Sequence, residues 1–304
     1  MGKESREFGL FIALFFSLYK VSERVLRRVR KTDDGWNNFI AGMVAGLSLL
    51  AESSGNRMGW AQYLFIRALH CSYNHFHTKL PLLQKLKHGN SILFVLSCAQ
   101  IVYGFALRPD SLPPEYAKFL GRLVHLPPMI IENVRKTVRN QPIDYEALVD
   151  YNKRNNGNGD PFNGFTLYPN VIPCSIIHPS SDCNERAFNL FSKSFKVSAA
   201  MYLSFYLIPL LLFKNKEFLK KPKFHLTNAV INTARSSSFL STFCLIAQWM
   251  LCGERKLISR RILEKESKYI FWFIGLIGSL TIFIEKFPRR TELALYVCHS
   301  INFR

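Results

Sequence analysis

Apolar runs alternate with basic stretches along the chain, and this alternation predicts a helical membrane protein. The six clearest runs lie at 8–19, 39–51, 91–107, 197–213, 239–252 and 270–284. Each is shorter than the roughly 20 residues that carry a helix across a bilayer, so flanking residues or local thinning must complete a span. The alternative is that two or three are buried helices that do not cross. We expect an all-α polytopic membrane protein with about six apolar helices.

The segments between and after these runs differ in character. The stretch 58–73 is apolar but carries Arg67 and His70, which favours an interfacial helix, and 289–303 is expected to form an amphipathic helix. A long polar region contains a loop composition at 153–164 and a short helix at 114–123, which begins with two prolines. We therefore expect a first membrane repeat at 1–107, a polar connecting region at 108–194 and a second membrane repeat at 195–304.

Composition narrows the choice of partners. The chain of 304 residues has a net charge of +19 and is 48% hydrophobic. Its basic residues sit mostly beside apolar runs, which favours contact with anionic lipid headgroups over binding to nucleic acid. We also expect protein partners in the same membrane. The seven cysteines are odd in number and several lie in or beside apolar runs, which argues against a secreted disulfide framework.

The sequence resembles itself when it is shifted by 233 positions. Residues 42–57 then align with 275–290 without a gap, and small, acidic and basic positions are preserved together. The identical pairs include Gly42 with Gly275, Glu52 with Glu285, Arg57 with Arg290, and Tyr63 with Tyr296. This pattern predicts an internal duplication, a common device in transporter-like folds.

The repeated segment suggests two structural roles. Gly42 and Gly46 in the first copy, and Gly275 and Gly278 in the second, are expected to allow close helix packing. Glu52 and Glu285 each precede an arginine by five positions, Arg57 and Arg290. One interpretation is a helix end at the headgroup level with both charges solvated, and this is the one we favour. The alternative is that the two glutamates form a buried pair that orients the two copies.

A second candidate site is the segment CSIIHPSSDC, where Cys174, His178 and Cys183 could serve as zinc ligands. A structural zinc site needs a fourth ligand, and Cys252, Cys298, His125 or His225 could supply it. We favour instead a structural role for a reduced or disulfide-bonded cysteine pair. The sequence shows no phosphate-binding glycine loop, catalytic triad or His-Glu-x-x-His motif, and we expect no enzymatic activity.

Several segments in order resemble the transmembrane protein 135 family, particularly its fungal members. They are AGMVAGLSLL, HGNSILFVLSCAQIVYGFALRP, LPPEYAKFL, IPCSIIHPSSDC, FKVSAAMYLSFYLIPLLL, TARSSSFLSTF and GLIGSLTIFIEKFPRRTELALY. The resemblance covers nearly the whole chain. The family is itself distantly similar to the mitochondrial inner-membrane translocase subunits. The first copy departs from the family because it lacks a Cys-His-Pro head.

The resemblance implies a non-enzymatic, integral protein of the peroxisomal or mitochondrial membrane. Its expected role lies in membrane organisation, organelle dynamics and lipid homeostasis. An alternative is a transporter or protein-translocation subunit with a polar path at the repeat interface, lined by Glu52 and Glu285. A third hypothesis is a metal-dependent enzyme centred on Cys174, His178 and Cys183.

Overall fold

The computed structural model describes residues 3–79, 88–155, 166–213 and 215–300. These ranges are helical and contain no strand, which confirms the predicted all-α class. The chain divides into two compact units, Met1–Leu86 and Lys87–Arg304, and each is described by itself.

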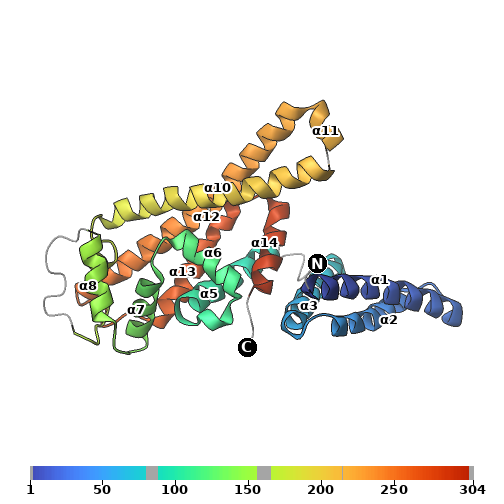
Figure 1. Cartoon of the computed structure of the whole chain (residues 1–304), viewed down its shortest axis with the longest axis horizontal. Helices are drawn as coiled ribbons and strands as arrows, with labels where there is room; N and C mark the ends of the chain where they lie inside the picture. Colours follow the sequence, from blue (N-terminus) through green and yellow to red (C-terminus); the bar gives the residue numbers. More distant parts are fainter. Residues whose placement is uncertain (1–2, 80–87, 156–165, 214, 301–304) are drawn as a thin grey trace. The chain divides into compact units, whose positions relative to one another are not determined.

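Figure 1 shows the helices in chain order. The first unit contains α1 Lys3–Arg30, α2 Gly35–Gly46, the 3₁₀ helix η1 Leu47–Ala51 and α3 Ser54–Lys79. The second unit begins with α5 Gly89–Leu107, η2 Pro109–Ser111, α6 Pro114–Val124, α7 Pro128–Val138, α8 Tyr145–Arg154 and α9 Cys174–Ile177. It continues with α10 Cys183–Phe213, α11 Asn215–Lys220, α12 Pro222–Ser259, α13 Lys268–Gly278, η3 Ser279–Ile284 and α14 Phe287–His299.

In the first unit, α1 turns back onto α2 through a short connection that its polar residues hold in place. Asp34 caps α2 by accepting a hydrogen bond from the Asn37 amide, and Arg30 donates two hydrogen bonds to Asp34 at 2.7 and 2.8 Å. The buried side chain of Asn37 donates to the Thr32 carbonyl at 2.6 Å. These contacts satisfy backbone groups that a helix end leaves without partners, and so they fix the α1–α2 turn.

In the second unit, α5 is the central helix and packs against both α13 and α14. Asn90 of α5 donates a hydrogen bond to Thr291 of α14 at 2.8 Å. The predicted first repeat ends at residue 107 and includes this helix, whereas the structure groups α5 with the second unit. The reason is tertiary: its packing partners lie about 180 residues further along the chain, a relation that apolar periodicity cannot reveal.

The region 108–194, expected to be a polar connection, is a packed part of the second unit. Helix α6 confirms the short helix predicted at 114–123, and α8 extends to Arg154. The remainder of the predicted loop, 156–164, lies outside the described residues. Aliphatic side chains of the region are fully buried, among them Ile130, Leu148, Ile172 and Ile176. They form a core with the end of α5, which makes this region structural in its own right.

Two arginines tie the same region to the end of α5. Arg135 of α7 donates from Nε to the carbonyl of Ala106 at 3.0 Å, and Arg139 donates to the carbonyl of Leu107. The last carbonyls of a helix have no partner within the helix and carry partial negative charge. Both arginines therefore cap α5.

The expected number of membrane helices was wrong for the described residues. Two described helices, Gly89–Leu107 and Cys183–Leu212, are long and apolar enough to cross a bilayer. The predicted runs 39–51 and 270–284 are each divided between an α-helix and a 3₁₀ helix, and each ends before a buried glutamate. The run 239–252 lies within α12, where the buried polar residues Ser241 and Gln248 indicate an internal helix. The segments 8–19 and 58–73 are parts of α1 and α3.

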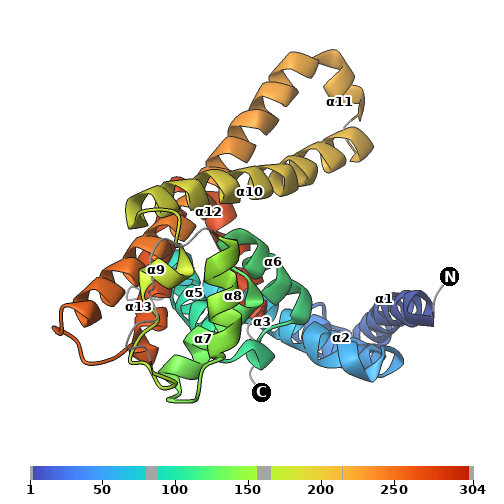
Figure 2. The same ribbon diagram turned by 60° about the vertical axis from the view of Figure 1, so that its left-hand side comes forward.

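Helices α10 and α12 form a long antiparallel hairpin joined by α11. Their contact is the most extensive between any two helices of the second unit. In Figures 1 and 2 the α11 end of this hairpin projects away from the remaining helices of the unit. Its opposite end lies beside α9, which brings the start of α10 next to the last turns of α12.

Candidate metal centre

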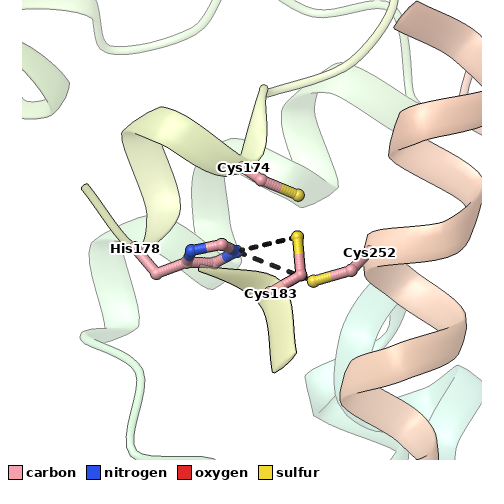
Figure 3. Close-up of side chains that lie close together, drawn as sticks. All are labelled: Cys174, His178, Cys183 and Cys252. Atoms are coloured by element: carbon pink, nitrogen blue, oxygen red, sulfur yellow. Dashed lines mark hydrogen bonds between the residues drawn. The ribbon is translucent and has the colours of Figure 1, made fainter. Parts of the chain in front are cut away.

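Four potential metal ligands meet at the base of the hairpin (Figure 3). Cys174 is the first residue of α9 and His178 follows its last turn. Cys183 begins α10, whereas Cys252 comes from α12 and is buried. Two distant parts of the chain therefore supply one cluster.

The spacing of these ligands fits a tetrahedral metal ion. The three Sγ atoms and a ring nitrogen of His178 all lie within 4.8 Å of one another. His178 Nε2 is 3.6 Å from Cys252 Sγ and 3.9 Å from Cys183 Sγ. Zinc bonds of about 2.3 Å to sulfur and 2.0 Å to nitrogen place neighbouring tetrahedral ligands about 3.6 Å apart. The cluster matches that requirement with small adjustments.

The imidazole of His178 is oriented for ligation. Its Nδ1–H donates to the carbonyl of Ser181 at 2.8 Å, because a carbonyl can only accept. This bond leaves the lone pair on Nε2, the atom that faces the sulfurs. Metal-binding histidines commonly use their second nitrogen in this way, and the outer hydrogen bond fixes the tautomer.

The electrostatics of the cluster favour a thiolate at Cys252. A hydrogen bond from the Cys174 thiol, with a further one from Gln248, lowers the pKa of Cys252 to about 3. The amide of Gln248 lies 3.1 Å from the Cys252 sulfur, to which it donates. The same hydrogen bond to Cys252 raises the pKa of Cys174. A metal ion binds thiolates, so a lowered pKa at Cys252 suits this residue to metal ligation.

The donor set suits structural zinc better than catalytic zinc. Three cysteines and one histidine complete four-coordinate zinc, whereas catalytic sites keep one position for water or substrate. The disulfide alternative does not occur, because all seven cysteines are free. Of the residues considered as a fourth ligand, the structure places Cys252 in the cluster. Cys298, His125 and His225 lie outside it.

The sequence did contain a signal for the fourth ligand. The midpoint between positions 183 and 252 falls in the middle of α11, the turn of the hairpin. Two antiparallel helices joined at that turn bring residues equally distant from it side by side. Recognition of 197–213 and 239–252 as one hairpin, rather than as two separate spans, would have selected Cys252.

The predicted Glu–Arg segments have the same local structure in both units. Arg57 donates from Nε to the carbonyl of Glu52 at 2.8 Å and from a terminal nitrogen to that of Leu50 at 2.8 Å. Arg290 makes the equivalent bonds, to Glu285 at 2.9 Å and to Phe283 at 3.0 Å. In each copy the arginine thus caps the 3₁₀ helix that precedes the glutamate. We call Leu47–Arg57 and its counterpart 280–290 the Glu–Arg modules.

The expectation that both glutamates are solvated was wrong. Glu52 and Glu285 are each only 2% exposed. Each carboxylate turns back onto the start of the following helix, where Glu52 accepts from the Ser53 amide at 3.1 Å and Glu285 from the Lys286 amide at 3.2 Å. A carboxylate at a helix N-terminus gains from exposed amides and the helix dipole, which offsets its burial. Each glutamate is held within its own unit.

The predicted packing glycines differ between the copies. A Cβ on Gly275 would lie 2.6 Å from the Ala99 Cα of α5, and one on Gly278 would lie 3.2 Å from the Phe243 ring. Within the first unit, a Cβ on Gly42 or Gly46 would have no neighbour within 4 Å. Close backbone approach therefore requires glycine at position 275, whereas nothing in the first unit requires it at 42.

Over the residues that the structure describes, these features define an all-helical protein with a closed Cys₃His cluster and two helices that could cross a membrane. No protein-family model matches the sequence, and no solved structure matches the chain.

Proposed function

We propose that this chain is a non-enzymatic, integral protein of the peroxisomal or mitochondrial membrane. Its role would be in membrane organisation, organelle dynamics and lipid homeostasis, as the resemblance to the transmembrane protein 135 family implies. The observation that carries the membrane part is the α10–α12 hairpin, whose projecting end exposes large apolar side chains. These include Ile208, Leu211, Leu212, Phe224, Val230 and Ile231.

Such a surface is costly in water. Soluble monomers rarely expose contiguous apolar patches of more than a few hundred Å² unless these bind a partner or a membrane. Helix α10 has 31 residues, enough to span a bilayer at 1.5 Å per residue. Lys220, Lys221 and Lys223 cluster near the tip. Basic residues there favour anionic headgroups once the apolar part is inserted.

The four-ligand set supports a structural rather than a catalytic role for a bound metal ion, because it leaves no coordination position for water or substrate. Three thiolates and one imidazole would hold zinc and link α9, α10 and α12. A bound ion would supply folding energy, because structural zinc binds the folded state in preference to the unfolded chain. The proposed internal duplication is supported by the shared hydrogen bonds of the two Glu–Arg modules.

Membrane insertion is tested by imaging a tagged full-length chain and extracting the membranes with alkaline carbonate. We expect signal on peroxisomes or mitochondria and retention in the pellet. The paired change Ile208→Asp and Leu212→Asp should release the protein, because a charge at bilayer depth costs about 2.5 to 3.5 kcal/mol. Ile262→Asp, at an exposed apolar residue outside the hairpin, is the matched control. Extraction of the unaltered protein, or a location on the plasma membrane, would overturn the proposal.

Zinc binding is tested by elemental analysis of the purified protein. We expect one zinc per chain, lost in Cys252→Ser and retained in the control Cys298→Ser. A chelator should lower the unfolding temperature of the wild-type chain and leave that of the zinc-free variant unchanged. A folded wild-type protein with no zinc after preparation in zinc-containing medium would contradict this assignment.

A further inference from the structure

The second unit contains a large apolar cavity that neither the metal centre nor the Glu–Arg modules explain. Its volume is about 770 Å³, and α5, α6, α7, α10, α12, α13 and α14 all contribute to its lining. Most of the lining side chains are aromatic or aliphatic, such as Phe94, Ile101, Leu120 and Leu240. Cavities of roughly 300 to 1,000 Å³ with such a lining are typical of ligand sites.

The cavity is long. Its lining residues on α12 run from Phe239 to Arg255. At 1.5 Å per residue these positions lie about 24 Å apart along the helix axis. An elongated apolar ligand therefore fits this space better than a compact one.

A positive charge lies near each end of the cavity, but the two differ. Arg255 is buried and its guanidinium lies 3.8 Å from a carboxylate oxygen of Glu266, which offsets its charge. Arg289 at the other end is half-buried and donates to the Ser236 hydroxyl at 2.8 Å. The Arg289 guanidinium also lies over the ring of Tyr206, at 4.6 Å from its centroid.

These contacts give the two ends different chemistry. Arg289 reaches the carboxylate of Glu285 through the Ser236 hydroxyl, which donates to Glu285 at 2.6 Å. Its guanidinium has five N–H donors, so hydrogen bonds remain available for an incoming anion. At the other end, the carboxylate of Glu266 already offsets the charge of Arg255, so an anionic group gains less there.

We propose that this cavity binds a lipid with one long acyl chain and an anionic head. The head would lie at Arg289, and the chain would run along α12 toward Arg255. A free fatty acid and a lysophospholipid share this chemistry. The proposed membrane function would bring the ligand within reach, but binding itself is measured on purified protein. A failure of binding is therefore distinct from a failure of membrane insertion.

The test uses the purified full-length protein, stripped of lipid, and a fluorescent fatty acid as the probe. We expect saturable binding that palmitate displaces and octanoate does not, because a short chain leaves most of the cavity unfilled. Lysophosphatidic acid in a parallel arm distinguishes a phosphate head from a carboxylate. The proposal is overturned if neither palmitate nor lysophosphatidic acid displaces the probe.

Two variants on α12 distinguish binding inside the cavity from nonspecific hydrophobic binding. Ala247→Phe adds a ring inside the cavity and should weaken binding at least about tenfold, a difference of about 1.4 kcal/mol. Ala234→Phe makes the same change at an exposed position of α12 that does not line the cavity, and it should leave binding unchanged. If Ala247→Phe fails to fold, Ala247→Leu gives the smaller filling change. Equal affinity of the folded cavity variant and the control contradicts the assignment.

A third variant tests the position of the head. Arg289→Gln should weaken binding of the fatty acid about tenfold while leaving the corresponding fatty alcohol unaffected. Equal loss for acid and alcohol would show that Arg289 acts through packing, and would overturn its assignment as the anion-binding group.

Discussion

The two Glu–Arg modules share a local structure but differ in what surrounds them. In both, an arginine five residues after the glutamate binds two carbonyls of the preceding 3₁₀ helix. In the second unit the module and the helix before it also have tertiary partners: α5 lies against Gly275 of α13, and Ser236 of α12 donates to the second oxygen of Glu285. In the first unit the second oxygen of Glu52 has no described hydrogen-bond partner. The backbone shape is therefore set locally, and tertiary packing is added to it.

The largest expected effect is that of Gly275→Ala, which disrupts the close helix contact found in the second unit. The new Cβ would lie 2.6 Å from the Ala99 Cα and 2.7 Å from the Cys98 carbonyl oxygen, both backbone atoms that cannot rotate away. Separating α13 from α5 should destabilise the second unit by roughly 3 kcal/mol, at the upper end of overpacking effects. Hydrogen–deuterium exchange of α5 and α13 peptides measures this change. Unaltered protection of these peptides would show that α5 does not depend on this close contact.

A smaller loss is expected from Ser236→Ala. The Ser236 hydroxyl donates to Glu285 at 2.6 Å and accepts from Arg289 at 2.8 Å, so its removal leaves a buried carboxylate oxygen without that donor. We expect a cost of about 2 kcal/mol in the unfolding of the second unit. Ser204→Ala is a suitable control, because that hydroxyl donates only to a carbonyl of its own helix. Equal effects of the two changes would show that Ser236 is dispensable to Glu285.

The local part of the comparison is tested by the pair Arg57→Met and Arg290→Met. Each removes the two hydrogen bonds to 3₁₀ carbonyls and keeps most of the aliphatic side chain. Because both sites are partly open to solvent, we expect a loss of about 1 kcal/mol in each unit. The loss is measured as increased exchange at residues 47–57 and 280–290. A large loss in one unit only would show that the surroundings, and not the module, determine the shape.

How far the sequence predicts this structure depends on the range over which the determining contacts act. Helical class, the helix at Pro114–Val124 and the likeness of the Glu52 and Glu285 segments all follow from local pattern. The burial of Glu52 and Glu285 does not follow from local pattern. A glutamate near an arginine in the sequence is equally consistent with a solvated helix end. The partners of both carboxylates include backbone amides, which carry no signature in the sequence, and Glu285 also accepts from Ser236 of another helix.

The same distinction holds for the metal centre. Cys174, His178 and Cys183 lie within ten residues, and their spacing alone raises the possibility of zinc. Cys252 joins them only because α10 and α12 pack against each other as a hairpin. The number of spans was overestimated for a related reason. An apolar helix packed against other helices has the same composition as one that faces lipid, and only tertiary contacts separate the two.

The smallest expected effect, and the one of opposite sign, is that of Gly42→Ala. Within the first unit a Cβ at Gly42 meets no atom within 4 Å, so alanine should stabilise α2 by about 0.5 to 1 kcal/mol through its higher helix propensity. Exchange of α2 peptides in detergent measures this gain, in direct contrast to the loss at Gly275. The same substitution can then be followed in membranes. If alanine stabilises α2 in both environments, Gly42 has no close packing partner. If alanine stabilises α2 in detergent but destabilises it in membranes, another helix packs on Gly42 as α5 packs on Gly275.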